Sequence, residues 1–330
     1  MTRKKVYRLK PAVKVFLVII VFCSLFIPVA WNKYQEYLYT KTNEYAFLQL
    51  GYGEDAVKLI LDKLNDEEEK AILTYQYNEF IPEFLKCKYF MFKNLDGYLG
   101  QVITKEDDFF KYRGTDGYDY DEIVALVNTN TDKPYYTDTK KTDLSLGYSI
   151  LCNKYYELGS DYVPDDLVDV SIKYYYGEAK KIRSEVYEAF KRMWSAAHEE
   201  GIYLIIVSAY RDYDSQVQVY NDYQESKGTN YADSIAARPG YSEHQTGLSL
   251  DIYSKDSTVA STFKNSKAYE WLINNAHKYG FILRYPDGKK KITGFNYESW
   301  HYRYLGEELA TKVYNEGITY DEYYAYYLAN

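Results

Sequence analysis

The stretch ARPGYSEHQTGLSLDI, residues 237–252, organises the second half of this 330-residue chain. His244 follows the turn Pro239-Gly240, and the alternating sequence after it predicts a strand that contains Asp251. A path from loop into strand lets the two side chains converge, whereas in a continuous helix they would lie about 10 Å apart. Because an unpaired buried charge is costly, a carboxylate in an apolar strand predicts a cationic partner.

A second motif, ESWHYRY at residues 298–304, supplies Glu298 and His301. Two imidazoles and one carboxylate can hold Zn²⁺ with a fourth position open to water. We therefore expect His244, Asp251 and His301 to be metal ligands. A glutamate three residues before the last ligand can take the proton of that water, so Glu298 is the expected general base. Trp300 should point away from the cavity, and the pattern favours a metal-dependent hydrolase.

Arg211 and Gln216 form a second candidate group at the end of the predicted strand YLIIV. A guanidinium there offers a fork for a substrate carboxylate or a developing oxyanion. Taken alone, Arg211 fits a plain salt bridge equally well. The remaining histidines, His198 and His277, fall in the last turns of predicted helices, where a cation suits the helix dipole, and we expect both to face solvent.

The N-terminus predicts a membrane anchor. Residues 1–14 carry six basic residues and no acid, and residues 15–31 are almost entirely apolar. A cleaved signal peptide is the alternative, but Pro28-Val29-Ala30 is a poor cleavage site. We expect a cytoplasmic tail at 1–14, a transmembrane segment at 15–31, a helical stalk or wall-contact module at 32–124, and an extracellular zinc domain at 125–330. Acids outnumber bases after residue 14, which argues against a nucleic-acid partner.

The order of expected elements favours an α+β fold, with a small antiparallel sheet flanked by helices. A helix is expected near residues 181–200, and amphipathic spacing predicts another at 268–280. Cys87 and Cys152 fit either a disulfide or two free thiols. The expected strands are YLIIV, LSLDI, FILRY, KITG and WHYRY, with the last three in one sheet.

Four motifs in order resemble the VanY-type D-alanyl-D-alanine carboxypeptidases, zinc peptidases that trim peptidoglycan stem peptides. They are SAYRDYDSQ (208–216), the stretch 237–252, GFILRYP (280–286) and ESWHYRY. The resemblance covers roughly residues 125–320. It implies Zn²⁺ at His244, Asp251 and His301, a general base at Glu298, and Arg211 gripping the substrate. Gln216 and Ser242 match positions that line the site. The chain departs from the common pattern at three positions within these motifs, Ala209, Ser249 and Ser299, and none of them is an expected ligand.

The expected activity is removal of the terminal D-Ala from a stem pentapeptide by a membrane-anchored zinc D,D-carboxypeptidase outside the cell. An L,D-carboxypeptidase acting on tetrapeptides would keep the same site and cut a different bond. A zinc-containing wall-binding module without catalysis is the third reading. Glu298 argues against it, because a structural metal site has no use for an acid at that spacing.

Overall fold

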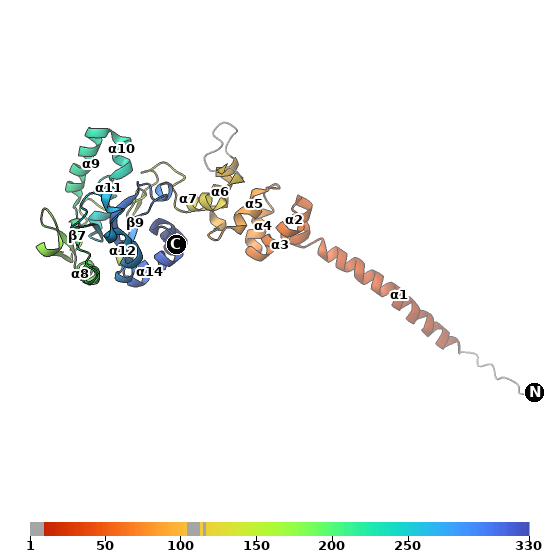
Figure 1. Cartoon of the computed structure of the whole chain (residues 1–330). Coiled ribbons are helices and arrows are strands. Elements are labelled where there is room, and N and C mark those ends of the chain that lie inside the picture. The colour runs from red at the N-terminus through yellow and green to blue at the C-terminus, as the bar shows by residue number, and fades with distance from the viewer. Residues whose placement is uncertain (1–9, 104–112, 115–116, 330) are drawn as a thin grey trace, which may run out of the picture. The chain divides into compact units, whose positions relative to one another are not determined.

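The computed structural model describes residues 10–103, 113–114 and 117–329 and divides into two compact units (Figure 1). We call residues 1–109 the N-terminal unit and residues 110–330 the C-terminal unit. The domain boundary predicted at residues 124–125 falls within helix α7 (Tyr120–Asn128) of the C-terminal unit.

The N-terminal unit is helical in its described residues. Polar side chains cap its helices: Thr42 accepts from the backbone of Tyr45, and Asn65 forms a reciprocal capping box with Glu68. Its buried core includes Phe47, Ile60, Phe84 and Tyr98. The helices are α1 (Pro11–Tyr39), α2 (Asn43–Leu50), α3 (Glu54–Lys63), α4 (Asp66–Ile72), α5 (Phe80–Lys86) and α6 (Leu95–Ile103), with a 3₁₀ turn, η1, at Phe92–Asn94.

Within the ranges that the structure describes, no helix has both the length and the apolar content that a membrane crossing requires. The structure therefore does not support the transmembrane segment predicted at residues 15–31.

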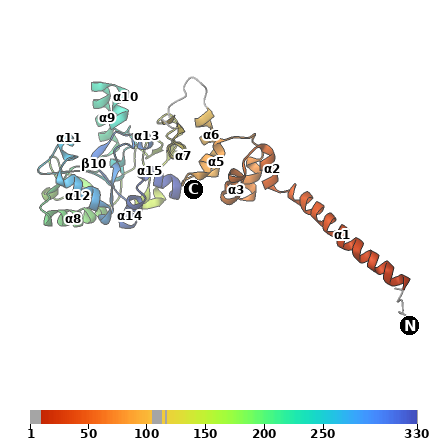
Figure 2. The same ribbon diagram turned by 45° about the vertical axis from the view of Figure 1, so that its right-hand side comes forward.

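The C-terminal unit is built on a four-stranded antiparallel sheet (Figures 1 and 2). Its strand order is β7 (Leu204–Ser208), β8 (Ser249–Ser254), β10 (Glu298–Tyr304) and β9 (Phe281–Tyr285). These four strands confirm the predictions from YLIIV, LSLDI, WHYRY and FILRY. The central strand β8 places Asp251 opposite Ser208 on one side and opposite His301 on the other.

Helices α8 (Ser184–Glu199) and α12 (Lys267–Asn275) pack against the sheet. Burial of each large apolar side chain contributes about 1.5–3 kcal/mol, so this core holds the strands that carry the site. Helices α9 (Tyr213–Lys227) and α10 (Thr229–Ile235) lie side by side in both views (Figures 1 and 2). The core unites Val186, Phe190, Met193 and Leu272 of the helices with Leu204, Ile206, Leu250, Ile252 and Tyr302 of the strands.

Short elements complete the unit. The strands pair as β1 (Arg113–Gly114) with β2 (Gly117–Tyr118), β3 (Lys140–Lys141) with β4 (Tyr156–Glu157), and β5 (Leu167–Asp169) with β6 (Lys181–Arg183). The α-helices are α11 (Ala260–Phe263), α13 (Lys290–Thr293), α14 (Glu307–Glu316) and α15 (Tyr320–Tyr323). The 3₁₀ turns are η2 (Leu144–Ser149), η3 (Ile172–Tyr174), η4 (Glu243–Thr246) and η5 (Ala276–Tyr279), and a π-helical turn, η6, spans Tyr324–Leu328.

The expectations for KITG and for His277 are wrong. KITG does not form a strand: its residues belong to α13 and its cap, because the carbonyl of Lys289 accepts from Ile292 and Thr293 and left-handed Gly294 ends the turn. His277 does not face solvent either. It is buried and stacks on Tyr314 with ring centroids 3.7 Å apart, because the helix end that carries it packs against α14.

Candidate active site

The pairing of two strands brings Asp251 and His301 together. They are direct partners across the antiparallel pair β8 and β10, so their side chains lie on the same face of the sheet. The Nδ1 atom of His301 is 3.1 Å from Oδ1 of Asp251. Both side chains are shielded from solvent, with 5% and 15% of their surface exposed.

His244 reaches the same point from the turn η4. Its Nδ1 donates to the carbonyl of Ala209 at 2.7 Å, and its Nε2 lies 3.5 Å from Oδ2 of Asp251. Burial lowers the pKa of His244, which keeps the ring neutral. Gly247 ends the turn in the left-handed conformation, φ +66°, where a side chain would meet Arg183 and Leu167.

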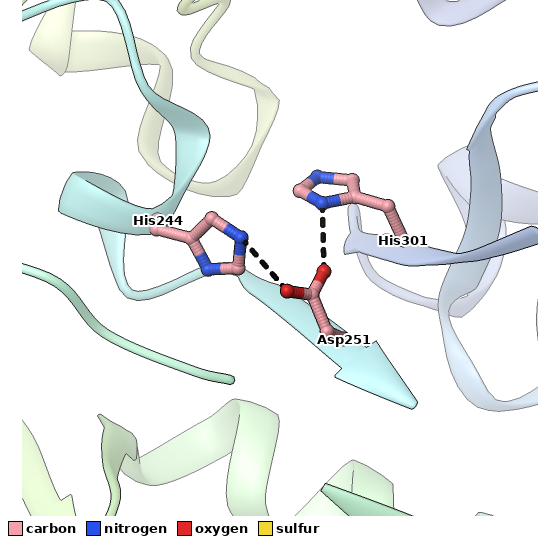
Figure 3. Close-up of side chains that lie close together, drawn as sticks. All are labelled: His244, Asp251 and His301. Atoms are coloured by element: carbon pink, nitrogen blue, oxygen red, sulfur yellow. Dashed lines mark hydrogen bonds and ion pairs between the residues drawn. The ribbon is translucent and has the colours of Figure 1, made fainter. Parts of the chain in front are cut away.

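Ligand atoms of His244, Asp251 and His301 all lie within 4.8 Å of one another (Figure 3). A tetrahedral metal with bonds near 2 Å fits that spacing, and two imidazoles with one carboxylate suit Zn²⁺. Although burial opposes it, the two histidines hold the pKa of Asp251 well below its usual range, so the carboxylate is ionised. The three residues predicted as ligands are thus brought together in a form that can bind a cation.

Glu298 faces the same cavity because β10 is irregular. In a regular strand, residues three apart point to opposite faces, but the register shifts between Glu298 and Tyr302. The shift brings Oε2 of Glu298 to 3.9 Å from Nδ1 of His301. Burial, reinforced by the charge of Asp251, raises the pKa of Glu298 to about 8 despite the opposing effects of His301 and Arg211.

Arg211 stands at the wall of the site, where two hydrogen bonds fix its guanidinium. It donates to Gln216 Oε1 and to Ser208 Oγ, each at 2.9 Å, and N–H groups remain for a carboxylate. Gln216 in turn donates to the carbonyl of Ala237, which joins α9 to the segment before the first ligand. Ser242 is buried and lines the same cavity.

These residues surround a cavity of about 400 Å³, a size typical of ligand pockets. Sequence reasoning missed three residues that line this cavity: Tyr223 of α9, Tyr231 of α10 and Asn296. No spacing pattern in the sequence predicts that these residues line the cavity, because their positions depend on how α9 and α10 pack. Trp300 also lines the cavity, contrary to the expectation that it points away, since the shift in β10 breaks the strict alternation.

A buried ionic cluster behind the site was also missed. Glu243 accepts from Arg284 at 2.7 Å and from Arg303 at 2.9 Å, and Arg284 also pairs with Asp321. Both arginines are fully buried. The available signal was an arginine within each of the apolar strands FILRY and WHYRY, because a charge at such a position needs a buried partner.

Comparison with known proteins relates this site to one family. Residues 179–307 match the family described as D-alanyl-D-alanine carboxypeptidase, VanY. The chain is 38% identical to YodJ of Bacillus subtilis strain 168 over 204 residues, which cover 58% of this chain and 75% of YodJ. It is 33% identical to a D-alanyl-D-alanine carboxypeptidase of Enterococcus faecium over 220 residues, or 63% of this chain and 68% of that protein.

Among solved structures, the chain is similar to the LD-carboxypeptidase LdcB. The TM-score is 0.54 at 36% sequence identity, and the match covers 58% of this chain and 91% of the LdcB chain.

Proposed function

Because this chain belongs to the VanY family of D-alanyl-D-alanine carboxypeptidases, a family of zinc metallopeptidases, we propose that it removes the terminal D-Ala from pentapeptide stems of peptidoglycan. One observation carries the proposal. Three metal-binding side chains, a glutamate of raised pKa and a fixed guanidinium meet in one cavity. Metal-assisted hydrolysis of a peptide with a free carboxylate requires these groups together.

His244, Asp251 and His301 would hold the zinc. When bound, zinc polarises the scissile carbonyl and lowers the pKa of water toward ~7. Glu298 takes the proton of the attacking water on its carboxylate. It then gives this proton to the leaving amine, so that the new C–O bond replaces the C–N bond and D-Ala departs. A pKa near neutrality suits a group that must both accept and donate a proton.

Arg211 would position the substrate. Its guanidinium is fixed by Ser208 and Gln216 beside the metal ligands, so it can hold a substrate carboxylate through charge-assisted hydrogen bonds. Ser242 and Gln216 would line the path of the peptide, as polar groups at the wall of the same cavity. Tyr223 and Tyr231 line the same cavity and offer further contacts to the peptide.

An L,D-carboxypeptidase acting on tetrapeptides is the second candidate, favoured by the similarity to LdcB. The same metal, base and arginine serve both reactions, and the shape of the cavity selects the bond. Incubation of the purified protein with tri-, tetra- and pentapeptide stems, followed by mass spectrometry, separates them. We expect the pentapeptide to lose one alanine. A pentapeptide left intact while the tetrapeptide is shortened would replace the first candidate by the second, and zinc binding with no product from any stem would refute both.

We also propose that the enzyme acts outside the cytoplasm, attached by its N-terminal segment. The support is the basic stretch at residues 1–14, the apolar composition of residues 15–31, and a substrate that lies in the cell wall. Protease treatment of intact wall-free cells should degrade the C-terminal unit and leave the cytosolic proteins intact. Recovery of the full-length protein after this treatment contradicts the proposed location.

A further inference from the structure

Glu243 directly precedes the ligand His244 in the chain, yet its side chain contacts a different ligand. Its Oε2 lies 3.3 Å from Nε2 of His301 and accepts from Ser249 Oγ at 3.1 Å. Its Oε1 accepts from the guanidinium groups of Arg284 and Arg303. The side chain is fully buried. Each carboxylate oxygen therefore has its own set of partners.

The two arginines hold this carboxylate in place. Arg303 also donates to the carbonyls of Tyr148 and Ile150, and Arg284 also pairs with Asp321 of α15. If either guanidinium lost its ion pair with Glu243, a buried charge would be left partly unpaired, which is costly. Oε1 of Glu243 accepts from both guanidinium groups, so this carboxylate is held as an acceptor.

The two nitrogens of His301 consequently face different carboxylates. Nδ1 faces Asp251, within the group of three residues that could hold a metal, and Nε2 faces Glu243, which is not part of that group. A neutral imidazole carries one proton, and the other nitrogen binds the metal. An ionised carboxylate can only accept, so it favours the proton on Nε2.

We propose that Glu243 is the positioning residue of the zinc site, which holds the proton of His301 on Nε2 and thereby leaves Nδ1 free as the metal ligand. This inference rests on the proposed zinc site. Glu243 acts through His301 and is not one of the three proposed ligands. Carboxylate partners of this kind orient metal-binding histidines, and their loss weakens metal binding about 10–100-fold.

Glu243→Gln tests this role with little change in shape. The oxygen of the new amide must stay at the Oε1 position, because two arginine N–H groups point at it and an amide nitrogen cannot accept them. The amide nitrogen then occupies the Oε2 position and donates to Nε2 of His301. The proton of the ring moves to Nδ1, the atom that should bind zinc.

The matched control is Asp321→Asn. This substitution takes one negative charge from the same Arg284, but Asp321 hydrogen-bonds Arg284 and Asn153 rather than a ligand residue. Both variants should lower the melting temperature of the protein, because both weaken the same buried cluster. Only Glu243→Gln should weaken zinc binding.

The measurement is the zinc dissociation constant of the purified full chain at one pH, by competition with a chromophoric chelator. We expect it to rise about 10–100-fold in Glu243→Gln and to stay within about threefold of wild type in Asp321→Asn. A Glu243→Gln constant within about threefold of wild type overturns the proposal, and so does equal weakening in both variants. Wild-type protein that binds no zinc refutes the proposed function instead.

A second measurement needs no variant and decides the matter if Glu243→Gln fails to fold. Long-range ¹H–¹⁵N spectra of the zinc-loaded wild-type protein report which ring nitrogen of His301 carries the proton. We expect the proton on Nε2 and the metal on Nδ1. A proton on Nδ1 overturns the proposal.

Discussion

At the scale of single residues, two buried glutamates beside His301 show how surroundings decide a group's role. Glu298 lies near Nδ1, and burial raises its pKa to about 8. Glu243 lies near Nε2, and Arg284 and Arg303 hold its pKa well below the usual range despite burial. A carboxylate that exchanges a proton near neutrality can serve as base and acid, whereas one paired with two guanidiniums serves as a fixed acceptor.

Glu298→Gln should abolish turnover and leave zinc binding nearly intact. The amide keeps the shape of the side chain but cannot take a proton, and a positioned base contributes about 10²–10⁴-fold to the rate. Release of D-Ala and the zinc content of the purified protein are the two measurements. Glu308→Gln is the matched control, because Glu308 is exposed and its ion pair is with Lys312 on α14, away from the site. A Glu298→Gln rate near that of wild type would contradict the assigned role.

The metal-free protein should lose stability as the pH rises from about 6 to about 9. Burial lowers the pKa of His301, but hydrogen bonds to Asp251 and Glu243 outweigh it and raise the value to about 9. Its stabilising contribution is complete below about pH 6.5 and is lost as the pH rises through 9. Glu298 acts in the same direction, because its raised pKa lets the folded protein keep a proton that the unfolded chain has lost.

Urea unfolding in the presence of a chelator at several pH values measures this effect. For each proton that the folded protein holds and the unfolded chain has lost, the free energy of unfolding falls by about 1.4 kcal/mol per pH unit. Saturating zinc is the control, because the metal would displace the proton on Nδ1 of the charged His301 ring and should reduce the decline. If the stability of the metal-free protein rises over this pH range, the pKa values of His301 and Glu298 are not raised in the folded state.

The sequence predicts the residues that carry out chemistry better than those that support them. His244, Asp251, Glu298 and His301 stand in two short motifs whose spacing fits a zinc site, and the structure brings them together. Arg284 and Asp321 come from separate segments, and their contact depends on how α15 packs. The spacing of residues within one motif does not predict a contact between two separate segments.

At the scale of elements, β10 shows that a local sequence pattern can predict a strand without predicting a register shift within it. The sequence predicted the strand WHYRY, and β10 contains it. The register shift within it, set by pairing with β9, decides that Glu298, Trp300 and His301 all line the cavity. KITG was mistaken for a strand because four residues of mixed polarity carry little periodic signal.

The join between the turn η5 and β9 should tolerate no side chain at Gly280. This residue has φ +87°, and an added Cβ would lie 2.6 Å from the ring of Tyr304 and 3.0 Å from the backbone of Gly306. Gly288 has φ +77° with open space around it, so Gly288→Ala is the matched control. We expect a loss of about 1–2 kcal/mol for Gly288→Ala from the left-handed backbone alone, and a larger loss for Gly280→Ala. Urea unfolding measures both, and equal losses would contradict the close packing at Gly280.

At the scale of the whole molecule, the proposed zinc site joins the neighbouring residues His244 and Asp251 to His301, which lies 50 residues after Asp251 in the chain. His244 comes from η4, Asp251 from β8 and His301 from β10, so a metal there links the turn to the two central strands. All three ligands belong to the C-terminal unit. A ligand that binds only the folded state stabilises it by RT ln(1 + [L]/Kd), which is about 4 kcal/mol at 1,000 times Kd.

Removal of zinc should therefore loosen the C-terminal unit and leave the N-terminal unit unchanged. Hydrogen exchange measured by mass spectrometry on the full chain, with zinc and with a chelator, compares the two in one sample. Peptides from β8 and β10 should exchange faster without zinc, because opening these strands no longer requires release of a metal. Peptides from α3 and α5 provide the internal control, since their core of Val57, Ile60, Ile81 and Phe84 contains no ligand residue. Equal acceleration in both sets of peptides would mean that zinc stabilises the chain through something other than these three side chains.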